Sequence, residues 1–278
     1  MIRVPGHGRR RPSSPVRRLA GPLVAVAVLA SATPAVAATS SAISPAPALA
    51  ATTSAARVGA ETPADPPSRT ADPTVVLLTP VAVRTAPERD APRVTTIAAR
   101  RPITGVRTVL PVVRRTTDAT GRRWLRVRLP GRVLGSPAPP PQGWILEQGT
   151  RSGVHPWRIV VDVEARRVTV FRDRVRLRSF RAVVGTAETP TPRGRFFVEE
   201  NVRIPSDRTG GPFALATSAR SSVLQEFDGG PGQIALHGRD GIGGRLGTAV
   251  SHGCVRLADR EIAWIADRVA PGALITFE

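Results

Sequence analysis

Apolar and polar residues alternate over much of the second half of the chain. The alternation runs through residues 159–163, 168–170 and 175–184, where arginines occupy many of the polar positions. A period of two residues is typical of antiparallel strands that bury one face. Another strand is predicted at 196–198, and a short strand at 233–236 leads directly to His237. This half of the chain is therefore expected to be rich in β-structure.

One segment near the end has a helical period instead. Residues 259–269 place Ile262, Ile265 and Val269 on one face, as an amphipathic helix does. A proline–glycine pair ends this pattern, and residues 273–277 predict a closing strand. The second domain is thus predicted to be mainly β, with one clear helix.

The segment before this domain resembles a known small β fold. Apolar runs separated by turn residues predict five strands, at 75–78, 81–83, 93–98, 106–113 and 124–129. The runs Val83–Pro87, Trp124–Val127 and Gly143–Ile145 resemble bacterial SH3-like domains, although a long insertion over 130–142 departs from that pattern. The resemblance implies a small SH3-like β-barrel that binds cell-wall polymers or acts as a spacer, and both tryptophans are expected in its core.

Four segments are expected along the chain. Residues 1–37 are typical of a signal peptide, because an arginine-rich start precedes an apolar run over 19–32 and a small-residue cleavage site. Residues 38–72 are rich in Ala, Pro, Ser and Thr and are expected to be a flexible linker. An SH3-like domain is expected over 73–150, and the second domain over 155–278. The arginine pair at 17–18 leaves open whether export uses the Sec or the twin-arginine route.

The charge of the chain is strongly positive and uneven. All 40 basic residues are arginine, the formal net charge is +19, and residues 73–150 alone carry thirteen arginines against four acidic residues. A basic module favours anionic partners, which for an exported protein are wall polymers rather than nucleic acid. The membrane is expected as a partner only transiently, through the signal peptide.

The single cysteine is the main candidate for chemistry. Cys254 lies in the run Ser251-His252-Gly253-Cys254-Val255-Arg256, and His237 lies seventeen residues before it. An unpaired cysteine in a secreted chain indicates a reactive thiol, and a nearby histidine can take its proton. His252 and His237 are both candidate bases, and the N–H groups of Gly253 and Cys254 are candidate oxyanion donors. A zinc site built from the same side chains is the alternative, but the spacing matches no common zinc signature, so no metal and no cofactor are expected.

These residues together resemble the L,D-transpeptidase catalytic domain, also called the YkuD family. Its pattern is a histidine, a gap, and then Ser/Thr-His-Gly-Cys followed by Asn or Arg, which His237 and Ser251–Arg256 match. The run Thr191–Phe196 also matches the family's Thr-Pro-x-Gly-x-Phe turn. The resemblance covers about residues 157–278.

The resemblance implies a role for each site residue. Cys254 is expected to be the nucleophile and His237 the proton acceptor and donor, oriented by the carbonyl of Gly238. His252 is expected to shape the site, and the backbone around Gly253 to stabilise the oxyanion. Two further residues are expected to contact the substrate, namely Arg256 and Ser251.

The expected function is that of an exported enzyme of the cell wall or periplasmic space. It would use a cysteine thioester to form 3→3 cross-links between peptidoglycan stem peptides. Two alternatives stay open: an L,D-carboxypeptidase, in which water is the acceptor, and a wall-binding protein, in which the basic 73–150 segment dominates and catalysis is incidental.

Overall fold

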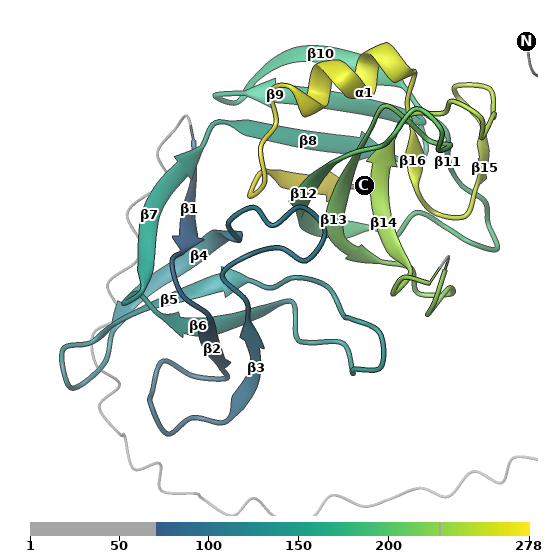
Figure 1. Ribbon diagram of the computed structural model, residues 1–278. Coiled ribbons are helices and arrows are strands. Elements are labelled where there is room, and N and C mark those ends of the chain that lie inside the picture. Colours follow the sequence, from purple (N-terminus) through teal and green to yellow (C-terminus); the bar gives the residue numbers. More distant parts are fainter. Residues whose placement is uncertain (1–70, 228) are drawn as a thin grey trace, which may run out of the picture. The chain divides into compact units, whose positions relative to one another are not determined.

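The computed structural model describes residues 71–227 and 229–278. The expected signal peptide, and all but the end of the expected linker, lie outside the described residues. Strands dominate this part of the chain, and α1 (Asp259–Ala266) is its one helix (Figure 1). No helix among these residues has the length and apolar character needed to cross a membrane. The described residues all fall within one compact unit of the chain.

The first sheet has seven strands in the spatial order β3-β2-β6-β5-β4-β1-β7. They are β1 (Asp72–Leu77), β2 (Val81–Arg84), β3 (Arg93–Ile97), β4 (Val109–Thr117), β5 (Arg123–Arg128), β6 (Gln142–Leu146) and β7 (Thr150–His155). Alternate residues are buried along β2, whereas β1 and β5 each also bury two neighbouring residues. Trp124 is buried, and its indole N–H donates to Asp118 at 2.9 Å, whereas Trp144 is only partly buried, so the expectation that both tryptophans lie in the core is wrong for Trp144. The likeness of this segment to SH3-like domains stays a prediction.

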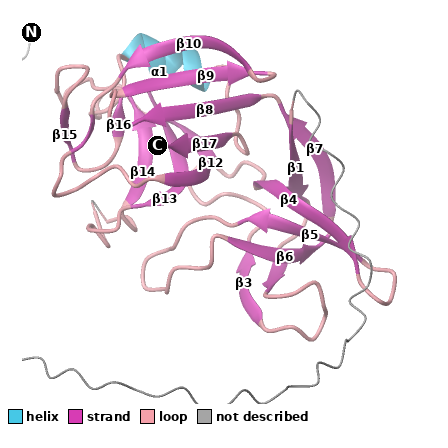
Figure 2. Ribbon diagram, turned by 180° about the vertical axis from the view of Figure 1, so that it is seen from behind, coloured by secondary structure: helices cyan, strands magenta, loops and turns pink. Residues whose placement is uncertain are grey.

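The second sheet has eight strands in the order β10-β9-β8-β17-β12-β13-β14-β16, and a small parallel pair joins β11 to β15 (Figure 2). The strands are β8 (Trp157–Asp162), β9 (Arg167–Arg172), β10 (Val175–Arg181), β11 (Val184–Gly185), β12 (Gly194–Arg203), β13 (Phe213–Arg220), β14 (Gln233–His237), β15 (Ala249–Ser251), β16 (Val255–Arg256) and β17 (Leu274–Phe277). The mainly β character and the single helix near the end of the chain are confirmed.

Helix α1 covers this sheet with the face that the sequence predicts. Ile262, Ile265 and Val269 are fully buried in one core with residues of β8, β9 and β13. The Glu261 carboxylate accepts the Ala258 N–H at 3.2 Å, which satisfies one donor at the start of the helix. The helix ends at Ala266, three residues earlier than the apolar period suggests.

The structure differs from the sequence prediction in two strands of the second sheet. Val175 and Leu177 were expected to be buried, but they are 62% and 46% exposed. The reason is that β10 is an edge strand whose register shifts between Arg176 and Arg178. In contrast, β13 was not predicted, because its alanines, serine and threonine are buried on both faces and show no alternation.

The first sheet also extends beyond the expected limits. β7 pairs with β1 along its whole length, so the paired residues run from Asp72 to His155. Phe197 of β12 is buried in the core of the first sheet, with Leu274 of β17 packed against it. The two sheets therefore share apolar contacts, and the 73–150 and 155–278 domain limits stay predictions.

Candidate active site

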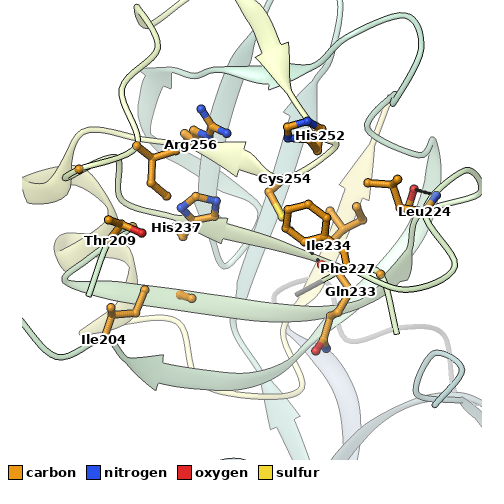
Figure 3. Close-up of a pocket in the computed structure, with 16 residues that line it drawn as sticks. Ile204, Thr209, Leu224, Phe227, Gln233, Ile234, His237, His252, Cys254 and Arg256 are labelled. Carbon is orange, nitrogen blue, oxygen red and sulfur yellow. Dashed lines mark hydrogen bonds between the residues drawn. The ribbon is translucent and has the colours of Figure 1, made fainter. Parts of the chain in front are cut away.

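Two adjacent parallel strands bring the sequence-predicted residues together. In β14 and β16, Leu236 pairs with Val255 and His237 pairs with Arg256. Side chains two residues apart on a strand share a face, so Cys254, just before β16, projects on the same side as Arg256 and His237. These three side chains line a cavity of about 830 Å³ and lie together at one side of it (Figure 3).

The His237 ring is held in one orientation by the residue that follows it. The Nδ1 atom lies 2.6 Å from the carbonyl oxygen of Gly238, so Nδ1–H donates and Nε2 is left as the basic atom. Gly238 must be glycine, because a Cβ there would lie 1.5 Å from the backbone oxygen of Gly211. The bond to the Gly238 carbonyl thus fixes the tautomer and the direction of the His237 ring, and the close packing on Gly211 holds that carbonyl in place.

The Cys254 thiol is free and lines the cavity. The Ala235 N–H points at Sγ from 3.4 Å, and the thiol faces the Gln233 carbonyl oxygen at 3.8 Å. Burial raises the pKa of Cys254, and the Ala235 N–H and the Arg256 charge oppose this only in part. The resting thiol is therefore protonated at neutral pH.

Burial also lowers the pKa of His237, and the positive charge of Arg256 lowers it further, while the bond to Gly238 acts against both. The resting pair is thus a neutral thiol and a neutral imidazole rather than a thiolate and an imidazolium. A buried, neutral thiol can still act as a nucleophile where a nearby imidazole takes its proton as the sulfur attacks.

Arg256 lines the cavity and brings a positive charge to it. Burial lowers the pKa of its guanidinium. Its Nε is buried without a hydrogen-bond partner among the described residues, and the same residues form no ion pair with it. A cation with unused donors beside the Cys254 thiol suits an anionic group of a ligand.

The turn before Cys254 is fixed by buried hydroxyls. Ser251 is 1% exposed, donates to the Cys254 carbonyl at 2.6 Å and accepts the Gly253 N–H at 3.2 Å. Thr191 is 3% exposed, donates to the Gly253 carbonyl at 2.8 Å and accepts the Gly185 N–H at 3.0 Å. Gly253 has φ +112°, which a side chain rarely adopts.

Two of the expected residues have surroundings that the sequence did not suggest. Ser251, expected to contact substrate, uses its hydroxyl within the turn and is not among the residues that line the cavity. His252 is exposed, and its ring lies 5.7 Å from the Phe227 ring, centroid to centroid. This geometry favours His237 over His252 as the base.

Sequence reasoning missed four residues that build the site. Thr191 was noticed only as part of a turn motif, and its contact with a residue 62 positions away has no local signal. Leu224 and Phe227 line the cavity from a segment with no regular period, and Gln233 lines it from the predicted strand, although sequence reasoning assigned it no role in the site. Across the described ranges, 71–227 and 229–278, His, Cys, Asp and Glu side chains form no cluster of three that would hold a metal ion.

Comparison with known families defines the class of this domain. Residues 156–276 match the family of L,D-transpeptidase catalytic domains, YkuD. This match supports the L,D-transpeptidase-like domain that the sequence predicts at these residues, and it covers less than half of the chain.

Two curated proteins named as L,D-transpeptidases match the same part of the chain. YkuD of Bacillus subtilis is 27% identical over 121 residues, and YkuD of Bacillus licheniformis is 30% identical over 122 residues. Each match covers 44% of this chain and 65% of the relative, so the chain spans less than two thirds of the length of these relatives.

Solved structures show more distant likeness. An L,D-transpeptidase from Mycobacterium smegmatis is 21% identical with a TM-score of 0.36, covering 56% of this chain and 90% of its own. The L,D-transpeptidase LdtMt1 in complex with imipenem is 22% identical with a TM-score of 0.37, covering 62% and 91%. At these values the likenesses carry no functional argument.

Proposed function

We propose that the protein is an L,D-transpeptidase that forms 3→3 cross-links between peptidoglycan stem peptides. One observation carries the proposal: a free thiol lies in a cavity beside an imidazole whose Nδ1–H is committed to a carbonyl, which leaves Nε2 as the base. The match of residues 156–276 to L,D-transpeptidase catalytic domains supports the reaction class.

In the proposed first step, the Cys254 sulfur attacks the carbonyl carbon of the third residue of a tetrapeptide stem. The thiol proton passes to Nε2 of His237, and the carbonyl oxygen becomes an oxyanion. Backbone N–H groups of the turn around Gly253 are the proposed donors for this charge. The C–N bond to the fourth residue then breaks, and the leaving amine of D-alanine takes the proton from His237.

In the proposed second step, the amine of a neighbouring stem attacks the thioester. The acceptor nitrogen loses a proton to Nε2 of His237, a new amide bond forms, and the thiolate leaves and regains the proton. The neutral resting pair matches this sequence, because the imidazole must be unprotonated whenever it acts as the base.

Arg256 is proposed to bind the carboxylate of the terminal D-alanine of the donor stem. Its guanidinium lines the cavity, and its Nε has no partner among the described residues. A guanidinium holds a carboxylate through two parallel hydrogen bonds, which would place the scissile carbonyl near the sulfur.

Product analysis tests the proposed reaction. The purified chain is incubated with tetrapeptide stems, and the products are resolved by chromatography and mass spectrometry. Dimers joined through the third residues, absent with Cys254→Ala, are the expected result. Tripeptides alone would identify a carboxypeptidase instead, and unchanged tetrapeptides would refute catalysis of both kinds.

Two further parts of the proposal concern the rest of the chain. The basic 73–150 segment is proposed to be an SH3-like module that binds anionic wall polymers, because it holds most of the positive charge outside the leader. Export to the cell wall is proposed from the leader and linker, residues 1–72. Binding of the intact protein to isolated walls with and without their anionic polymers tests the first point.

A further inference from the structure

The wall of the active-site cavity is held by an arginine from the first β segment. The long β5–β6 loop, residues 129–141, reaches the β13 end of the second sheet (Figure 2). From this loop, the Arg132 guanidinium donates to three backbone carbonyls: Ser221 at 3.1 and 3.2 Å, Leu224 at 3.1 Å and Gln225 at 3.3 Å. All three belong to the irregular segment 221–227, which we name the wall segment.

The wall segment is part of the cavity. Ser221, Leu224 and Phe227 line it together with Cys254 and His252. Phe227 is 51% exposed, and its ring packs against His252, two residues before the nucleophile. The other hydrogen bonds of the wall segment are short-range, such as those from the Val223 and Leu224 N–H groups to Ser221 Oγ, so the Arg132 contacts connect it to a distant part of the chain.

The arginine is itself anchored. The Arg132 carbonyl accepts a hydrogen bond from the Arg220 Nε–H group at 3.0 Å. The Gly131 N–H donates to the buried Glu199 carboxylate at 3.0 Å. Glu199 also pairs with Arg101 of the first segment, and it accepts the side-chain amide of Gln233 at 3.3 Å. The negative charge of the buried Glu199 carboxylate is stable only because these hydrogen-bond and ion-pair partners surround it.

This network ends at the nucleophile. The Gln233 backbone carbonyl faces the Cys254 thiol, while the Gln233 amide is bound to Glu199. Residues from the first β segment thus contact the wall segment directly, and they reach Gln233 only through Glu199 of β12.

We propose that Arg132 is a positioning residue for the donor stem: it holds the wall segment in place so that Leu224 and Phe227 contact the bound peptide. It does not touch the reacting atoms. The catalytic consequence rests on the proposed transpeptidase function, whereas the anchoring of the wall segment does not.

Hydrogen exchange tests the anchoring without any substrate. In Arg132→Ala, amides of the wall segment should exchange about tenfold faster, the effect of losing one or more charge-assisted hydrogen bonds, while amides of β8 stay unchanged. Arg132→Lys should lie between wild type and Ala. Arg126→Ala, an exposed arginine on β5, is the matched control and should leave the exchange unchanged. Equal exchange in wild type and Arg132→Ala would overturn the proposal.

Donor kinetics test the consequence. For Arg132→Ala we expect the KM for a tetrapeptide donor to rise about tenfold, with a smaller change in kcat, while alkylation of Cys254 by iodoacetamide changes less than about twofold. An unchanged KM would overturn the positioning role. A wild-type chain that does not react with the donor would refute the proposed function, and hydrogen exchange would still decide the anchoring.

Discussion

Replacing Thr191 by valine should destabilise the turn that carries Cys254. The change keeps the shape of the side chain but removes its hydroxyl, which donates to the Gly253 carbonyl at 2.8 Å and accepts the Gly185 N–H at 3.0 Å. Each lost bond costs about 1 kcal/mol, and a buried donor left without a partner costs about 1–3 kcal/mol. Since Thr191 is only 3% exposed, water cannot readily replace the hydroxyl. We therefore expect a loss of about 2–4 kcal/mol in the free energy of unfolding.

Chemical denaturation of the two variants Thr191→Val and Thr191→Ser measures this loss. Serine keeps the hydroxyl and loses only a methyl group, at a cost of about 1 kcal/mol. Thr169→Val is a second control, because that hydroxyl lies 3.1 Å from Ser179 Oγ in a partly exposed pair. If Thr191→Val proves as stable as Thr191→Ser, the two hydrogen bonds do not hold the turn and the reasoning fails.

Three further predictions concern the cavity. The rate of Cys254 alkylation by iodoacetamide should rise with pH in a single step whose midpoint lies above the ordinary cysteine pKa, because burial raises the pKa of this thiol. A rate that has already reached its plateau below pH 7 would instead indicate a preformed thiolate. Gly238→Ala should lose about 3 kcal/mol or more of stability in thermal unfolding, because the new Cβ meets a backbone oxygen, whereas Gly230→Ala, with its nearest contact at 3.4 Å, should lose much less; similar losses would contradict the packing argument. Arg256→Gln should raise the KM for a tetrapeptide donor about tenfold but leave the KM for its C-terminal amide unchanged, and equal effects on both donors would exclude the carboxylate contact.

Local patterns in the sequence were enough to predict several features of the fold. The strand that ends at His237 and the buried face of α1 are both present, because each follows a period that a few consecutive residues display. His252, Cys254 and Arg256 of the motif also line one cavity with the distant His237.

Features that depend on distant contacts could not be predicted in this way. The burial of β13 on both faces removes its alternation, and the exposure of Val175 depends on β10 being an edge strand. Thr191 contacts a residue 62 positions away, and Arg132 contacts carbonyls about 90 positions away. No short stretch of sequence carries these pairings, because the fold alone brings their partners together.

The proposed function requires Cys254 to be a nucleophile that becomes acylated. Intact-mass spectrometry after exposure to a carbapenem tests this requirement. A β-lactam carbonyl that reacts with the thiol leaves a covalent adduct on the chain. We expect one adduct per chain, mapped to Cys254 by peptide analysis and absent from Cys254→Ala. A wild-type chain without an adduct, or an adduct that persists in Cys254→Ala, would contradict it.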